Sequence, residues 1–514
     1  MAHLEEVGSL QGVRLVRLAL NPIQQDFNVK TLKVTTDIQV KVIFKQIAKS
    51  EPLTLTPTIY EMVRTVTANG RELGNAILSA RGAETMLIVV GDSLKDAMAP
   101  FVTWKRAAGL GVDMVTLTEA GGTKEKVKEY VQKYYDTAAV KPAFLLFVGN
   151  KTSMPAFSES TSSGQAASDY RYALLTGADA IPDALYGRII ADNVDDVARQ
   201  INRAIAYEST PEKGADWYSK GLTIASADGS GPSDKEYAEQ VRAAMKVGAG
   251  TATYTVLDVF EAGNQSAKPE AVLKSVNEGR TWISYFGHGS GTAWASTNGY
   301  FSNTHVAQTT NADRLPIIID VACLNSSWVN LAKPFGKAWV TQTSNGKEAG
   351  AVAFYGGSVS ISWHPPAVMS VGVAKYHFEK PVHSLGGSVL AGQLYLVEKM
   401  GTGADVTDNI KWYNLFGDPS LQVRTATPKT YQLKHAVKKT AEGVTVTVTA
   451  VDGAGAGVAG LTAALGNGAE PVAVGTTDSK GQAILAVGGV GQLEPNTSVT
   501  TSGYNFESQQ KLVQ

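Results

Sequence analysis

Short apolar runs alternate with amphipathic segments over most of the chain. Between residues 86 and 423 the apolar runs have the length of buried strands, and the segments between them, such as 123–135 and 194–207, carry apolar positions at helical spacing. This alternation is typical of an α/β fold with a parallel sheet and helices on both faces. The predicted strands span residues 86–91, 112–117, 143–149, 185–190, 221–226, 253–258, 281–287, 315–322 and 350–355.

Nine strands in about 340 residues exceed one comfortable open sheet. We therefore predict two side-by-side α/β subdomains, at residues 85–215 and 216–427, divided at the Pro- and Gly-containing segment near 210–220.

Both ends of the chain show a two-residue period instead. Residues 13–20 and 29–45 flank the Asn21-Pro22 turn and predict a β-hairpin or part of a small β unit, followed by a connector up to residue 84. Beyond Pro428, the strict alternation of residues 444–449 lies between segments rich in Gly, Asp and Asn. Residues 428–514 therefore predict a β-sandwich of roughly immunoglobulin size.

Charge and hydropathy exclude several classes of protein. The chain has 46 Lys and Arg against 47 Asp and Glu, so no basic surface for nucleic acid or an anionic membrane is expected. No apolar run approaches the roughly 20 residues of a transmembrane helix, and we expect a soluble protein. The first six residues lack the features of a signal peptide, which fits a cytoplasmic protein or one whose export signal has been removed.

The single cysteine is the most informative residue. One thiol in 514 residues allows neither an intrachain disulfide nor a thiolate metal cluster, so Cys323 is either a buried filler or a reagent. Cys323 follows the strand 315–322, and His288 follows the strand 281–287. Because the carboxyl ends of parallel strands form the ligand crevice, we expect both residues in one cleft.

An imidazole beside a thiol activates it as a nucleophile. Singly, a histidine in a Gly turn is more often structural and a lone cysteine more often packing. Their joint position at two strand ends favours catalysis. The backbone amides of Gly289 and Cys323 are candidate donors to a developing oxyanion.

Three segments resemble the gingipain family of caspase-like cysteine peptidases: Gly-His-Gly-Ser with Thr-Ala-Trp (287–294), Asp-Val-Ala-Cys-Leu-Asn (320–325) and Phe-Gly-Asp-Pro-Ser-Leu-Gln-Val-Arg (416–424). The resemblance implies a caspase-like fold and a peptidase in which Cys323 is the nucleophile. It also implies that His288 is the base that later protonates the leaving amine, and that water hydrolyses a thioester intermediate.

Two acidic residues and a tryptophan acquire roles through the same resemblance. Asp228 matches the acidic residue that orients the histidine, although it also suits the start of a turn. Asp234 matches the acidic base of the first specificity pocket in arginine-specific members, although it is also a natural helix N-cap. Trp363 resembles the aromatic lid over that pocket. His364 departs from the lysine-specific pattern, which leaves arginine or a looser basic preference.

Upstream, residues 12–16, 21–24 and 32–34 resemble the end of the family propeptide. Arg64, Arg71 and Arg81 are then candidate processing sites, or simply solvated arginines. Residues 428–514 resemble the immunoglobulin-like domain of relatives, for which packing against the enzyme is favoured over binding a partner. Because family members are exported, we expect a secreted or cell-surface zymogen.

The chemistry requires no cofactor. Residues 179–183 and 192–196 are rich in Asp, whose oxygens suit calcium, but neither has a complete ligand spacing. Helix caps and turns are favoured there; a structural calcium stays open because the family binds calcium, and no metal ligand is assigned. We expect a monomer acting on protein or peptide substrates.

The leading hypothesis is an exported cysteine endopeptidase that cuts after arginine or another basic residue. One alternative is a sortase-like transpeptidase, which passes the same thioester to an amine. The other is a catalytically inactive adhesion or scaffold protein in which the β-sandwich is the functional part.

Overall fold

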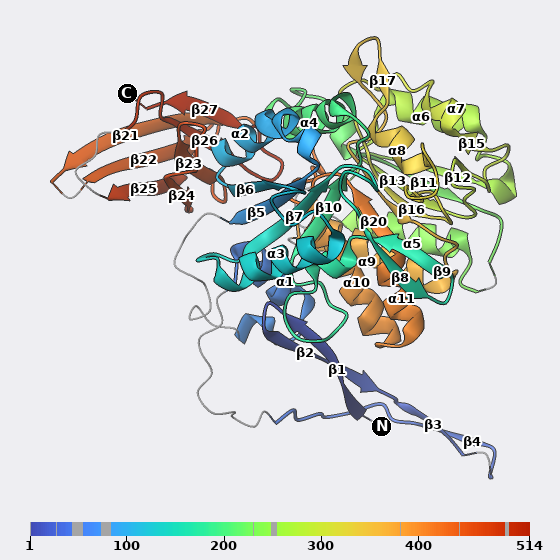
Figure 1. Cartoon of the computed structure of the whole chain (residues 1–514). Coiled ribbons are helices and arrows are strands. Elements are labelled where there is room, and N and C mark those ends of the chain that lie inside the picture. The colour runs from blue at the N-terminus through green and yellow to red at the C-terminus, as the bar shows by residue number, and fades with distance from the viewer. Residues whose placement is uncertain are drawn as a thin grey trace.

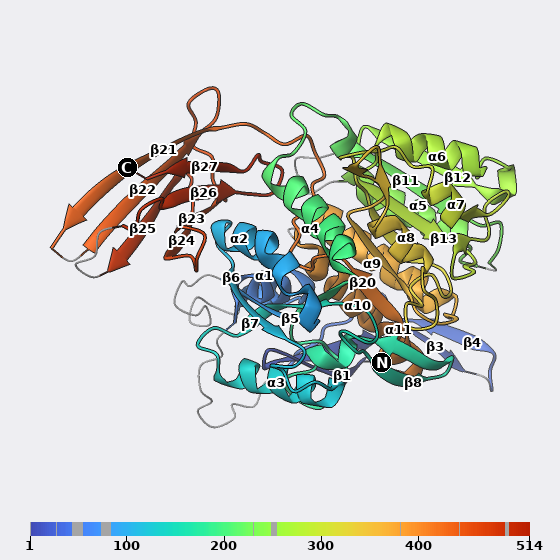
Figure 2. The same ribbon diagram turned by 45° about the horizontal axis from the view of Figure 1, so that its top comes forward.

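A computed structural model describes most of the chain: residues 2–26, 28–43, 55–72, 84–229, 231–247, 254–380, 382–441, 443–488 and 493–513. Figure 1 shows an N-terminal β unit in blue, a central α/β domain, and a C-terminal β-sandwich in red. The turned view in Figure 2 keeps the sandwich beside α2 (Ala99–Ala107), at one end of the central domain.

The central domain is built on one sheet of ten strands, in the order β12-β11-β13-β16-β19-β20-β10-β7-β5-β6. All nine predicted strands are present, although β12 covers 256–261 where 253–258 was predicted. The strands are β5 (Thr85–Val90), β6 (Gly111–Thr116), β7 (Pro142–Val148), β10 (Leu185–Ile189), β11 (Lys220–Ala225), β12 (Val256–Glu261), β13 (Trp282–Phe286), β16 (Ile317–Val321), β19 (Ala353–Gly357) and β20 (Tyr413–Phe416).

The α/β class with mostly parallel strands is confirmed, but the two predicted units share this one sheet. The four strands before residue 210 pair in parallel with one another, as do the five between 220 and 357. The tenth strand, β20, was not among those predicted. It runs antiparallel to β19 and reaches β10 through the pair Arg188–Phe416, so it joins both groups. A four-residue strand directly after a helix is too short for its period to be recognised.

Strand side chains alternate between two cores. On β13, Trp282 and Phe286 belong to one hydrophobic cluster, while Ile283 and Tyr285 belong to another on the opposite face. This follows from the two-residue period of a strand. In Figure 1, α5 and α9 cover the first of these faces and α6 and α8 the second. The main helices are α3 (Lys124–Thr137), α4 (Val194–Ser209), α5 (Asp234–Val247), α6 (Pro269–Glu278), α7 (Asn303–Val306), α8 (Phe335–Val340), α9 (His364–Glu379), α10 (Leu385–Met400) and α11 (Ala404–Trp412).

The N-terminal unit differs in its pairing from the prediction. β2 (Val13–Leu20) pairs with β1 (Ala2–Leu10), not with the segment after Pro22. The turn is formed by Gln11 and Gly12, both with positive φ, as a two-residue hairpin turn requires. β3 (Ile23–Asp26) and β4 (Thr31–Val34) form a second hairpin. The sequence prediction missed β1 and its turn at Gln11 and Gly12.

Two aspartates of the Asp-rich loop hold this unit against the central domain. The backbone N–H of Gln11 donates to Asp183 at 2.9 Å, and that of Ser9 donates to Asp179 at 2.9 Å. Asp183 also accepts the backbone N–H groups of Leu175 and Thr176. Within the described segments, no group of three or more His, Cys, Asp or Glu side chains is arranged to hold a metal ion.

The candidate processing sites lie in the connector. Arg64 is on α1 (Pro57–Val66), where it pairs with Glu61 at 2.9 Å. Arg71 is exposed on a short 3₁₀ turn, and Arg81 lies outside the described residues. Among the helices of the described chain, none combines the length and apolarity that spanning a bilayer requires.

The C-terminal sandwich has its own core and leans on the central domain. One sheet contains β21 (Gln432–Thr440), β22 (Gly443–Val451) and β25 (Gln482–Gly488); the other contains β23 (Thr462–Gly466), β24 (Ala473–Thr476), β26 (Ser498–Ser502) and β27 (Gln509–Leu512). Between them lie side chains such as Val446, Leu465 and Val499.

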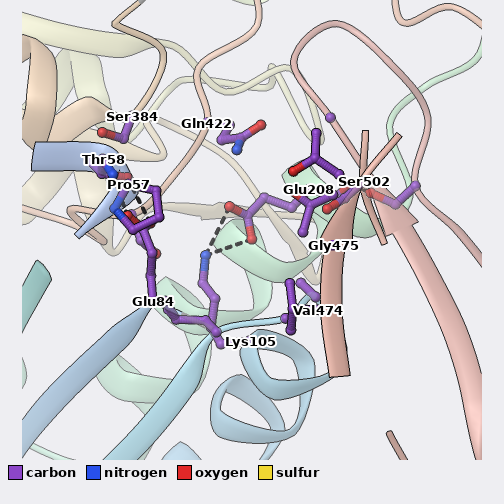
Figure 3. Close-up of a pocket in the computed structure, with 18 of the residues that line it drawn as sticks. Pro57, Thr58, Glu84, Lys105, Glu208, Ser384, Gln422, Val474, Gly475 and Ser502 are labelled. Atoms are coloured by element: carbon purple, nitrogen blue, oxygen red, sulfur yellow. Dashed lines mark hydrogen bonds and ion pairs between the residues drawn. The ribbon is translucent and has the colours of Figure 1, made fainter. Parts of the chain in front are cut away.

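A cavity of ≈ 660 Å³ lies at the junction of the sandwich and the central domain. Figure 3 shows Lys105 of α2 reaching Glu208 there, and the two charges are 2.7 Å apart. The same ammonium is 2.6 Å from Asp418, which lies two residues after the end of β20. This buried ion cluster ties α2, α4 and the end of β20 together, away from the predicted catalytic residues.

Candidate active site

Two neighbouring strands bring His288 and Cys323 to the same edge of the sheet. β13 and β16 pair in parallel with Phe286 opposite Val321, and His288 and Cys323 each follow two residues later. Paired strands lie about 4.8 Å apart. The two functional side chains therefore leave the sheet from equivalent positions on adjacent strands.

The backbone of Gly289 runs directly against the backbone of Cys323. A Cβ atom at this position would lie 2.2 Å from the carbonyl oxygen of Cys323 and 3.0 Å from its nitrogen. Only glycine permits that approach. The close contact brings the backbone of Gly289, a candidate oxyanion donor, beside Cys323.

The environment of the thiol favours its neutral form. Burial is the main cause that raises the pKa of Cys323, and the nearby charge of Asp320 adds to it. Backbone hydrogen bonds with Ile361 and Gly289 act in the opposite direction. The sulfur also lies 3.9 Å from the carbonyl oxygen of Ile361. A thiol in this setting needs a base to become a nucleophile at neutral pH.

Asp228 reaches the imidazole from the third strand of the group. β11 pairs with β13, with Ala225 opposite Phe286, and Asp228 follows three residues after Ala225. Its Oδ2 lies 3.5 Å from Nε2 of His288, and the two side chains are 52% and 57% exposed. An exposed pair of this kind adds little stability.

The backbone around His288 is held by two side-chain hydroxyls. Tyr285 Oη donates to the carbonyl of His288 at 2.8 Å, and the N–H of His288 donates to Ser296 Oγ at 2.9 Å. The N–H of Ser296 in turn donates to Tyr285 Oη at 3.0 Å. The loop that presents the imidazole is thus fixed by a closed set of hydrogen bonds.

Asp234 does not cap its helix. Ser233 does so: its Oγ accepts the N–H of Glu236, and the Glu236 carboxylate accepts the N–H of Ser233, which is a capping box. The Asp234 side chain instead turns inward and is only 2% exposed. Burial raises the pKa of its carboxyl, and a 2.6 Å hydrogen bond from Ser226 Oγ opposes that rise.

Trp363 lies beside the catalytic candidates. Its ring packs edge-on against His288, with the ring centroids 5.3 Å apart. A Cβ atom at Gly229, next to Asp228, would lie 3.2 Å from Trp363 Nε1. The tryptophan therefore stands next to both the imidazole and the loop that carries Asp228.

Ser226 is a site residue that sequence reasoning missed. Its Oγ donates to Asp234 and accepts the N–H of Asp228 at 2.8 Å, while its own N–H continues the ladder to Phe286. One buried hydroxyl thus positions both acidic candidates. A serine directly after a buried strand was the available signal, but such a serine is common in turns.

Known proteins resemble the chain over most of its length. A sequence model of peptidase family C25 matches residues 79–424, about two thirds of the chain. Gingipain R2 of Porphyromonas gingivalis is 27% identical over 517 residues, covering 98% of this chain and 68% of that protein. Lys-gingipain of the same species is 25% identical over 472 residues, covering 84% of this chain and 26% of that protein.

Solved structures agree with this resemblance. The complex of the RgpB pro- and mature domains of Porphyromonas gingivalis matches with a TM-score of 0.75 and 26% identity, over 83% of this chain and 99% of that chain. The Arg-specific cysteine proteinase gingipain R matches with a TM-score of 0.74 and 25% identity, over 84% of this chain and 98% of that chain.

A methyl group at Gly289 tests the contact between the two loops. We expect Gly289→Ala to reduce thiol-dependent turnover by about 100-fold, because the added carbon displaces the His288 loop from Cys323. Gly453→Ala is the matched control, since that glycine has open space around it. Initial rates with a peptide substrate measure the effect. Unchanged turnover in Gly289→Ala would contradict the close approach.

Proposed function

The chain belongs to peptidase family C25 and is a cysteine endopeptidase, and on this premise we propose that Cys323, His288 and Asp228 perform its chemistry on bonds after arginine or another basic residue. The observation that carries the proposal is the parallel register of β11, β13 and β16. It sets the three residues at neighbouring strand ends.

The reaction begins with the thiol. Cys323 Sγ attacks the carbonyl carbon of the scissile amide while its proton passes to His288. The carbonyl oxygen gains negative charge, which the N–H groups of Gly289 and Cys323 stabilise. Collapse of this intermediate breaks the C–N bond, and the imidazolium protonates the leaving amine. A thioester between Cys323 and the acyl part of the substrate remains.

Water completes the cycle. His288 takes a proton from the water, whose oxygen attacks the thioester carbonyl, and the C–S bond breaks to release a carboxylic acid and restore the thiol. Asp228 keeps the imidazole oriented and stabilises it while it carries the extra proton. Because burial raises the pKa of Cys323, the resting thiol is neutral and loses its proton to His288 during the attack.

The preference for a basic residue is supported by Asp234. A buried carboxylate with one hydrogen bond from Ser226 has capacity left for a guanidinium, which binds carboxylates through two parallel N–H groups. One solved relative is described as Arg specific and another relative is named Lys-gingipain, so the relatives do not decide between the two. Trp363 supplies an apolar wall for the stem of a long basic side chain.

We further propose that the enzyme is made as a zymogen, that its N-terminal β unit is the end of a pro-segment, and that it acts as a monomer outside the cytoplasm or on the cell surface. The support is its similarity to relatives that include a structure of pro- and mature domains. The contacts of Asp179 and Asp183 with residues 9–11 give the pro-segment a defined place on the central domain.

Replacement of the nucleophile is the first test. Cys323→Ala should reduce cleavage of an arginyl peptide below detection while the melting temperature stays within a few degrees, because only one half-buried sulfur is lost. Residual turnover would remove Cys323 from the mechanism. The reaction products show whether water or an amine accepts the acyl group from the thioester. A free acid product supports hydrolysis, whereas a mostly ligated product in the presence of an added amine would identify the enzyme as a transpeptidase.

Asp228 is tested with an isosteric change. Asp228→Asn should lower kcat by at least ~10-fold and leave KM nearly unchanged, because the amide no longer stabilises the imidazolium. Steady-state kinetics measure both constants. An unaffected kcat would show that Asp228 serves only the turn before α5.

Asp234 is tested through substrate choice. Asp234→Ala should lower kcat/KM for an arginyl peptide by about 100-fold, because a guanidinium loses its buried partner, and should change cleavage after a neutral residue far less. Glu239→Ala, on the exposed side of the same helix, is the matched control. A uniform loss for both substrates would make Asp234 a structural residue.

A further inference from the structure

A carboxylate with no cationic partner is buried beneath the catalytic edge. Asp320 lies on β16, three residues before Cys323, and has no exposed surface. It takes part in no ion pair within the described chain; its hydrogen-bond donors are Trp294 and Asn325. Burying a charge without a counter-ion is costly, so its surroundings must compensate by hydrogen bonding.

The first donor belongs to the histidine loop. This loop runs from Gly287 to Trp294 and carries His288 and Gly289. Trp294 Nε1 donates to Asp320 Oδ1 at 2.6 Å. The indole ring is itself fully buried and packs against the ring of Tyr285, whose hydroxyl holds the carbonyl of His288. One end of the histidine loop is therefore fixed on Asp320.

The second donor belongs to the cysteine loop. Asn325, two residues after Cys323, donates from Nδ2 to Asp320 Oδ2 at 3.1 Å. The other end of the same amide accepts the backbone N–H of Gly291 at 3.1 Å. Asn325 thus connects Asp320 to the middle of the histidine loop. The carboxylate and the amide together cross-link the two loops at two points.

Electrostatics does not explain this carboxylate. Burial raises the pKa of Asp320 to about 7, so the charge is unfavourable where it lies. The same charge raises the pKa of Cys323, which opposes thiolate formation. Tyr285 and Tyr413 are the other titratable groups that interact with it, and neither supplies positive charge. The contribution of Asp320 is therefore to hold the histidine loop and the cysteine loop in position.

We propose that Asp320 is a positioning residue that, through Trp294 and Asn325, sets the separation of the His288 loop from the Cys323 loop. The proposal rests on the proposed function of Cys323 and His288. It adds a buried group that touches neither substrate nor thiol, yet determines whether imidazole, sulfur and the Gly289 amide line up. Misplacement of reacting groups by about 1 Å costs on the order of 100-fold in rate.

The side chains of Asp320 and Asn325 can be exchanged between the two positions, so that the donor and the acceptor of their hydrogen bond change places. In Asp320→Asn the new amide faces donors at both contacts, from Trp294 and Asn325, and one contact must break. In the double variant D320N/N325D the amide at 320 accepts from Trp294 and donates to the carboxylate at 325. That carboxylate still accepts the N–H of Gly291, so every hydrogen bond is restored.

Four proteins are compared by steady-state kinetics and thermal unfolding: the unaltered chain, each single variant and the double variant. We expect each single variant to lose about 100-fold in kcat with KM within about threefold, and the double variant to recover at least 10-fold of that loss. Asp418→Asn is the control. It removes another buried carboxylate, paired with Lys105, and should lower stability without changing kcat.

Each outcome decides the proposal. A double variant that is folded but no more active than the single variants would overturn it, as would a double variant that fails to fold. If a single variant does not fold, activity of the double variant within 10-fold of the unaltered chain supports the proposal, and lower activity overturns it. Should the unaltered chain cleave no peptide, the proposed function fails. The exchange is then judged by the alkylation rate of Cys323, which the double variant should restore.

Discussion

The parallel pairing of β13 with β16 is the interaction on which the site depends. Its register sets Phe286 opposite Val321 and so fixes the points at which the chain leaves the sheet toward His288 and Cys323. A slip of one residue would turn every side chain on one strand to the other face and separate the pair. The large apolar side chains that β13 divides between two cores make such a slip costly.

Three carboxylates at this edge differ mainly in their contact with water. Asp228 is half exposed and faces the imidazole. Asp234 is buried but keeps capacity for a cation, and Asp320 is enclosed entirely and holds two loops together. In the proposed function, the same chemical group orients an imidazole at Asp228, recognises a cation at Asp234 and positions two loops at Asp320. Ser226 links the first two, because its hydroxyl donates to Asp234 and accepts the N–H of Asp228.

The sequence was sufficient for nine strands of the central sheet, because each is a short, mostly apolar segment of the length of a strand. It also placed His288 and Cys323 shortly after two such strands, and their catalytic roles stay a prediction. The sequence was insufficient where a segment becomes a strand through pairing with a distant part of the chain. β20 is too short to be recognised, and β1 pairs through a Gln-Gly turn that carries little signal. Asp320 was part of a recognised motif, but its partner Trp294 is distant in sequence, so only the structure relates them.

The proposed mechanism depends on proton sharing between one imidazole and the single thiol of the chain. The most direct measurement is the rate of Cys323 alkylation by iodoacetamide between pH 5 and 8, in the unaltered chain and in His288→Ala. The account predicts faster alkylation with the imidazole present at neutral pH, since the base offsets the burial that raises the pKa of the thiol. Identical pH profiles for the two proteins would contradict it.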